Sequence, residues 1–119
     1  MVGYPLAVLA LLHRATGDPE LLTAARGYFD FAAGCKGVQE FFFSHKVGWG
    51  AGLLYAITGE ERYAQFAAGV CDHLVRMQAG DGRWLADMTP VFSFDQTAEC
   101  AIWLREISAL LGAAPPRVS

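Results

Sequence analysis

Two carboxylates with helical spacing are the first residues in this sequence whose types suit chemistry. Asp95 and Glu99 are four residues apart, so on a helix they lie on one face. Glycoside cleavage needs such a pair, one carboxyl group as the acid and the other as base or nucleophile. A structural alternative exists, because Ser93 and Gln96 fit a capping box and an acid in a first turn favours the helix dipole. Asp95 and Glu99 are therefore catalytic candidates beside a capping interpretation.

His45 is the third catalytic candidate. A histidine at this place can act as an acid or a base, or bind a hydroxyl group. It lies next to Lys46, just before a glycine-rich segment around Trp49. The structural alternative for His45 is a capped loop histidine, and His13 and His73 fall within predicted helices, where a structural role is the more common one.

The candidate substrate-binding residues combine aromatic rings with carboxylates, mostly in two long loops. Trp84 can stack on a sugar face, although an indole that anchors a loop to the core is more usual. Asp81 begins an Asp-Gly turn signal. Phe43 ends a run of three phenylalanines that is either a short buried strand or part of a pocket wall. The full set is Phe43, Trp49, Trp84, Asp81 and Asp87.

The sequence predicts no metal site and no cofactor. Cys71 and His73 are the only close pair of ligand types, and residues two apart point to different sides of a helix. No structural zinc spacing is present. The cysteines, Cys35, Cys71 and Cys100, are odd in number and lack framework spacing. Free thiols in a reducing compartment fit this pattern, which predicts a cytoplasmic location.

Five helices must position these residues, because apolar residues recur at helical spacing and no stretch keeps the alternation of a strand. Their expected ranges are 3–16, 19–33, 46–58, 60–77 and 94–111. We therefore expect an all-α fold with a single domain over residues 1–112 and a frayed tail at 113–119.

A gapless internal repeat groups the helices into hairpins. Residues 11–32 align with residues 53–74, and both copies carry a short Thr-Gly-acid turn. Helical hairpins that recur at about 40 residues indicate a solenoid or a closed ring. The long connections, 34–45 and 79–93, then fall on one face, where the odd-numbered helices begin and their positive N-terminal dipoles frame any site.

This arrangement resembles the (α/α) toroid shared by the six-hairpin glycosidases and the isoprenoid cyclases. The turn AITGEERYAQFA looks like the repeated hairpin of the six-hairpin group, and DQTAECAIWLREI is similar to the start of an inner helix there. The resemblance implies a partial toroid of about five helices, since complete rings need more helices than this chain offers. It also implies a glycoside hydrolase-like or sugar epimerase-like domain, or a reduced derivative of one.

A second resemblance points to the triterpene cyclases. The segment QAGDGRW, residues 78–84, matches their Q-x-x-x-G-x-W repeat, in which Gln and Trp tie successive outer helices together. The repeat occurs once here, and the Asp-x-Asp-Asp acid motif is absent. The alternative functions are therefore an isoprenoid cyclase-like or polyprenyl-binding toroid and a non-enzymatic helical-repeat interaction module.

Composition and charge limit the partners. Hydrophobic residues make up 54% of the chain and charged residues 18%, whereas an average soluble domain has about 25% charged residues. The net charge of −3 argues against nucleic acid, and no apolar run reaches the roughly 18 residues that span a bilayer. A small-molecule or sugar substrate remains as the expected ligand.

The excess apolar surface predicts a homodimer or a larger closed assembly, with the first helix in the contact. Gly48, Gly50 and Gly52 in the third helix indicate a close backbone approach to a neighbouring helix or room for a ligand. They also offer a flat surface to a second chain.

Overall fold

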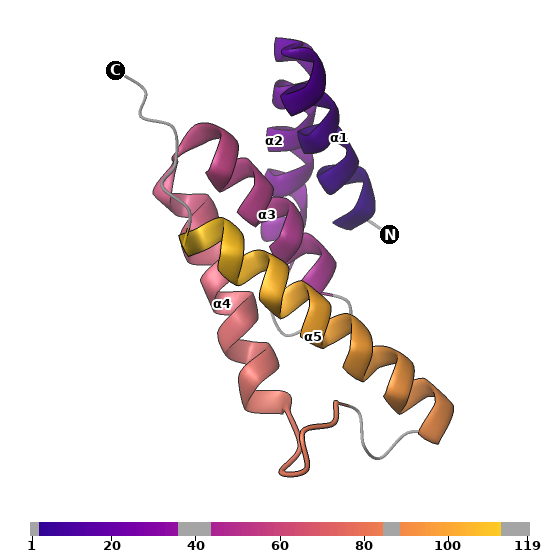
Figure 1. Cartoon of the computed structure of the whole chain (residues 1–119). Helices are drawn as coiled ribbons and strands as arrows, with labels where there is room; N and C mark the ends of the chain where they lie inside the picture. The colour runs from indigo at the N-terminus through magenta and orange to yellow at the C-terminus, as the bar shows by residue number, and fades with distance from the viewer. Residues whose placement is uncertain (1–2, 36–43, 85–88, 113–119) are drawn as a thin grey trace.

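The computed structural model describes residues 3–35, 44–84 and 89–112, and these ranges contain five α-helices and no strand (Figure 1). The helices are α1 (Gly3–Thr16), α2 (Pro19–Ala33), α3 (Ser44–Thr58), α4 (Glu61–Met77) and α5 (Pro90–Gly112). The all-α prediction is therefore confirmed. The tail predicted at 113–119 lies outside the described residues.

The two halves of the internal repeat form matching turns. Gly17 and Gly59 have φ angles of 74° and 72°, a region that glycine enters without strain. The Thr16 and Thr58 hydroxyls each donate a 2.7 Å hydrogen bond to the carbonyl four residues earlier. Each hydroxyl also accepts from the amide of the acidic residue that follows the glycine, at 3.2 and 3.1 Å. The Thr-Gly-acid pattern therefore encodes the same tight link twice.

The fifth helix begins four residues earlier than its pattern predicts. It starts at Pro90, whose missing amide hydrogen suits a first-turn position. The capping-box interpretation of Ser93 and Gln96 is therefore wrong. The Ser93 hydroxyl instead donates a 2.9 Å hydrogen bond to the backbone carbonyl of Trp84.

The helix α3 is the centre of the fold, because it contacts each of the other four helices. Its glycines make this possible. A Cβ built on Gly48 would lie 2.8 Å from Val70 of α4, and one on Gly50 would lie 2.6 Å from Leu6 of α1. Close approach to neighbouring helices is thus confirmed, and the suggestion that these glycines face a second chain is wrong.

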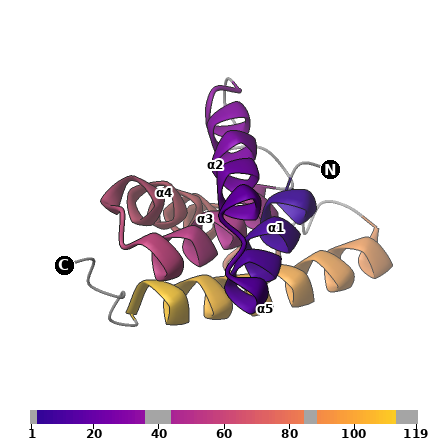
Figure 2. The same cartoon turned by 90° about the horizontal axis from the view of Figure 1, so that it is seen from above.

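The helices run in alternating directions around α3. Figure 1 shows α1, α3 and α5 starting towards the lower right, while α2 and α4 return, so both short turns lie at the upper side. In Figure 2, α5 lies along one edge of the molecule and α2 projects from the opposite side. The odd-numbered helices therefore begin towards the same end, as the loop lengths predict.

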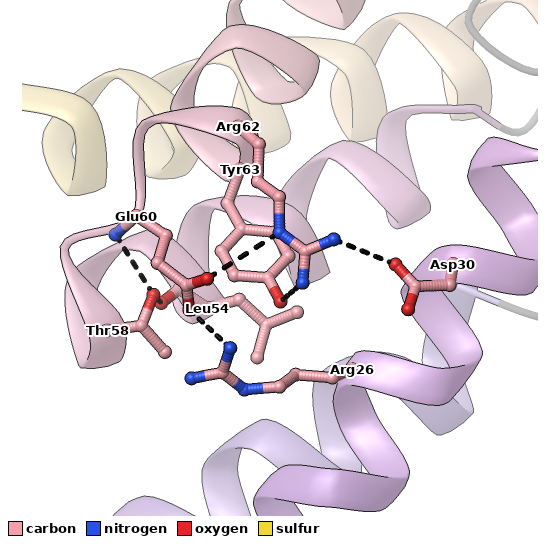
Figure 3. Close-up of polar contacts among 7 residues, drawn as sticks. All are labelled: Arg26, Asp30, Leu54, Thr58, Glu60, Arg62 and Tyr63. Carbon is pink, nitrogen blue, oxygen red and sulfur yellow. Dashed lines mark hydrogen bonds and ion pairs between the residues drawn. The ribbon is translucent and has the colours of Figure 1, made fainter.

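A polar cluster joins the first hairpin to the second outside the apolar core (Figure 3). Arg62 of α4 donates to Asp30 of α2 at 3.0 Å and to the Tyr63 hydroxyl at 2.6 Å. Arg26 of α2 forms an ion pair with Glu60 at the start of α4. Burial raises the pKa of Tyr63, so its hydroxyl stays neutral and accepts the bond from Arg62.

Within the described ranges, none of the five helices combines the length and the apolar character needed to cross a membrane.

Candidate functional site

The first turn of α3 and the middle of α5 bring His45 and Glu99 together, and Gln96 links Asp95 to them. His45 Nε2 and Lys46 Nζ, both from the first turn of α3, each lie 3.8 Å from Glu99 Oε1 on α5. With Asp95 and Gln96 these residues form what we call the α3–α5 polar cluster. Two segments that are far apart in the sequence therefore contribute to one group of acids and bases.

Gln96 joins the two carboxylates of the cluster. Its Nε2 lies 3.1 Å from Glu99 Oε2 and 3.4 Å from Asp95 Oδ2. The Gln96 side chain is buried, Glu99 is partly buried and Asp95 is exposed. One amide group thus holds a sheltered carboxylate beside a solvent-facing one.

The two bases of the cluster are almost completely buried. His45 is 0% exposed and Lys46 is 5% exposed. Burial is the main cause that lowers the pKa of His45 below 6.5; the charge of Lys46 acts in the same direction, while Glu99 opposes it. His45 is therefore a neutral imidazole near neutral pH. Lys46 is buried beside Glu99, and proteins keep a lysine buried when an acid lies close to it.

A pair of stacked indoles extends the same faces of both helices. Trp49 lies three residues after Lys46 on α3, and Trp103 lies four residues after Glu99 on α5. Their ring centroids are 4.4 Å apart and the ring planes meet at 29°. Both residues are half-buried. The polar cluster therefore continues into an aromatic surface, the combination by which ligand sites fix and orient a small molecule.

Trp84, the second tryptophan predicted from the sequence, anchors the loop that precedes α5. Its indole Nε1 donates to the Leu74 carbonyl at 2.7 Å, and its backbone amide donates to the Thr97 hydroxyl at 2.9 Å. The side chain is 5% exposed. These contacts favour the anchoring interpretation of Trp84 over sugar stacking.

Asp81, a further substrate-binding candidate, is held in its own turn rather than in the α3–α5 polar cluster. The Asp81 carboxylate accepts from the backbone amide and the guanidinium of Arg83 at 3.1 and 2.8 Å. These bonds lower the pKa of Asp81 and stabilise the local turn. Phe43 and Asp87 lie outside the described residues.

The thiols nearest to these groups are poor nucleophiles. Burial raises the pKa of Cys100 to about 11, and the neighbouring Glu99 carboxylate adds to the shift. Burial also raises the pKa of Cys71. Because the thiolate is the reactive form, a Cys-His nucleophile gains no support. Across residues 3–35, 44–84 and 89–112, no three His, Cys, Asp or Glu side chains gather in a way that could hold a metal ion.

Gln96 and Trp103 are the residues of this site that sequence reasoning missed. Gln96 fits a capping box and Trp103 fits an apolar helix stripe, so neither pattern suggests a site. A usable signal was their spacing from Glu99, three and four residues, which puts all of them on one face. Comparison with protein-family models, curated proteins and solved structures gives no match to this chain.

Proposed function

We propose that this chain is a carbohydrate-active domain of the glycoside hydrolase type, with Asp95 and Glu99 as its reacting groups. The observation that supports this most is the Gln96 amide shared by the two carboxylates. Their nearest oxygens cannot be farther apart than the sum of the two hydrogen-bond distances. That limit is compatible with the roughly 5 to 5.5 Å between the carboxyl groups of retaining glycosidases.

The surroundings of the two acids favour different roles. Glu99 is sheltered and forms an ion pair with Lys46, which suits a nucleophile or base that acts as a carboxylate. Asp95 faces solvent on the same side of α5, where a leaving group can be protonated. His45 lies against Glu99 as a neutral imidazole and orients it.

The tryptophan pair supplies an apolar surface for a sugar ring. Trp49 and Trp103 are both half-buried, so part of the stacked pair is open to solvent. The Trp103 Nε1 atom is buried and has no hydrogen-bond partner within the described part of the chain. An unmade bond of this kind costs about 1 to 3 kcal/mol. A sugar hydroxyl that reached this donor would offset that cost.

Hydrolysis of chromogenic aryl glycosides, with sugar binding followed by tryptophan fluorescence, tests the proposal. We expect turnover of at least one glycoside by the natural chain and a loss of about 100-fold or more in Glu99→Gln, the scale of an acid–base group. Glu61→Gln, an exposed acid on α4, is the matched control and should keep full activity. Equal turnover in Glu99→Gln and the natural chain would contradict the assignment. Retention of a polyprenyl ligand without any glycoside cleavage would favour the isoprenoid alternative.

A non-enzymatic interaction module is the second candidate function, and one observation favours it. The outward side of α5 carries exposed apolar residues along much of its length, including Val91 and Phe94 at 81% and 69% exposure. A protein–protein contact is the usual reason for such a surface. This function does not exclude the first, because the face is distinct from the α3–α5 polar cluster.

A further inference from the structure

The two helices that form the candidate site run side by side in the same direction. Lys46 of α3 lies against Glu99 of α5. Trp49, three residues further along α3, stacks on Trp103, four residues further along α5. A step towards the carboxyl end of one helix is thus matched by a step towards the carboxyl end of the other. This register extends the site from the polar cluster towards the carboxyl end of both helices.

The candidate residues of α5 have a fixed order. Glu99 is four residues from Asp95 on one side and four residues from Trp103 on the other. Four residues correspond to about 6 Å along a helix. Figure 1 shows α5 as one uninterrupted helix through this region. The proposed acid Asp95 and the tryptophan pair therefore lie on opposite sides of Glu99.

In a retaining mechanism the two acids act on different atoms of the substrate. A carboxylate oxygen of Glu99 bonds to the anomeric carbon while the bond from this carbon to the glycosidic oxygen breaks, and the proton of Asp95 passes to that oxygen. Water then releases the sugar: its oxygen bonds to the anomeric carbon, one of its protons returns to Asp95, and Glu99 leaves as a carboxylate. The leaving group is consequently nearest Asp95. The sugar whose anomeric carbon reacts, the glycone, is nearest Glu99 and the residues beyond it.

We propose that the tryptophan pair binds the glycone and that Trp103 is the residue that selects it. This inference rests on the proposed function, because the order of the two acids defines the two sides of the site. The half-buried indoles offer an apolar surface to the ring of the sugar. The Trp103 Nε1 atom is buried and has no partner within the described residues, so a turn of this ring towards the ligand gives the donor a hydroxyl oxygen to bind. A site built to bind a hydroxyl group rejects an analogue that lacks it.

The charges around the tryptophan pair favour a neutral glycone. Glu106 lies three residues after Trp103, on the same side of α5, and is exposed. Among the described residues, Glu99 and Glu106 on this side of α5 outnumber the lysine of the cluster, Lys46. Arg105, two residues after Trp103, points to a different side of the helix. A uronic acid would add a negative charge that these carboxylates repel, so the glycone is a neutral pyranose.

A comparison of glycosides tests this orientation. Trp103→Phe keeps an aromatic ring and removes the N–H donor. On the para-nitrophenyl glycoside that the natural chain cleaves fastest, we expect kcat/KM to fall about tenfold, mainly through KM, which is the scale of one hydrogen bond. The fall should be equal for the phenyl glycoside of the same sugar, because the leaving group lies on the other side of Glu99. It should vanish for the deoxy sugar that lacks the bound hydroxyl. Tyr28→Phe removes a polar atom from an exposed aromatic residue of α2, so this matched control should keep the natural constants.

The indole N–H signals give a measurement that needs no turnover. The three tryptophans each give one signal in a nitrogen–proton correlation spectrum of the natural chain, assigned through NOE contacts. We add the methyl glycosides of glucose, galactose, mannose and xylose in turn. At least one should shift the Trp103 signal downfield, because its proton gains an acceptor. The signal of Trp84, which already donates to the Leu74 carbonyl, should stay in place. These spectra decide the question even should Trp103→Phe fail to fold.

The outcomes separate this inference from the proposed function. A loss of turnover in Glu99→Gln, with an unmoved Trp103 signal and natural kinetics in Trp103→Phe, would overturn the glycone assignment and leave the hydrolase intact. An effect of Trp103→Phe that depends on the leaving group would also overturn it, as would faster cleavage of a glucuronide than of the matching glucoside. A Trp103 signal that moves although no glycoside is cleaved would refute the hydrolase, and the glycone assignment with it, while sugar binding at the pair would stand.

Discussion

At the residue scale, the burial of His45 has a consequence for stability that titration can measure. Folding lowers the pKa of this imidazole below 6.5, so the unfolded chain binds the proton more readily in the interval between the two pKa values. Stability rises with pH wherever the unfolded state binds more protons. The contribution of His45 is therefore complete above pH 6.5 and is lost as the pH falls towards the folded-state pKa.

We predict that His45→Gln reduces the loss of stability on acidification. The free energy of unfolding from urea titrations should fall between about pH 7.5 and pH 5.5 in the natural chain, and less steeply in the variant, because the variant lacks this linked proton. If the free energy of unfolding falls equally steeply with pH in His45→Gln and in the natural chain, protonation of His45 does not contribute to the loss of stability.

At the element scale, two glycines in helices should respond in opposite directions to the same substitution. A Cβ on Gly27 of α2 would meet nothing within 4 Å, so Gly27→Ala should stabilise the chain by about 0.5 to 1 kcal/mol through helix propensity. A Cβ on Gly50 of α3 would lie 2.6 Å from the Cγ and Cδ2 atoms of buried Leu6. Overpacking costs about 1 to 3 kcal/mol, which exceeds the gain in helix propensity.

Chemical denaturation of the two alanine variants measures this difference. Gly50→Ala should unfold at a lower urea concentration than the natural chain and Gly27→Ala at a higher one, with similar denaturant slopes. A stabilising Gly50→Ala would show that α1 can move away from α3 at little cost.

The helix boundaries show which parts of the fold can be predicted from local sequence patterns and which cannot. The Gly17 turn and the Asp18 cap end α1 and begin α2 where the pattern predicts, because both signals act within a few residues. The start of α5 was predicted too late, since a Ser-x-x-Gln pattern competed with the signal of Pro90. The Ser93 hydroxyl binds the carbonyl of Trp84, nine residues away, and no local pattern contains that contact.

At the scale of the whole molecule, the candidate site depends on contacts that spacing cannot supply. The sequence predicts that Asp95 and Glu99 share a helix face, and it places His45 at the end of a loop just before another helix, whereas His45 lies in the first turn of α3. It does not tell which face of α5 lies against α3. That choice brings Lys46 to Glu99 and Trp49 to Trp103, and it depends on how the glycines of α3 admit neighbouring helices.

The central position of α3 also bears on how the chain unfolds. In a linear array of hairpins each unit contacts only its neighbours, so terminal units can melt alone. Here the middle helix α3 contacts helices of both flanking units, so the loss of either unit would expose part of the apolar surface of α3. We therefore expect one cooperative transition, with coincident far-ultraviolet and near-ultraviolet circular dichroism curves and with the slowest hydrogen exchange at the amides of α3. Early exchange in α3, or a separate melting step for α1 and α2, would show that the hairpins are independent. If the transition is single, neither hairpin is a module that can be deleted or transplanted alone.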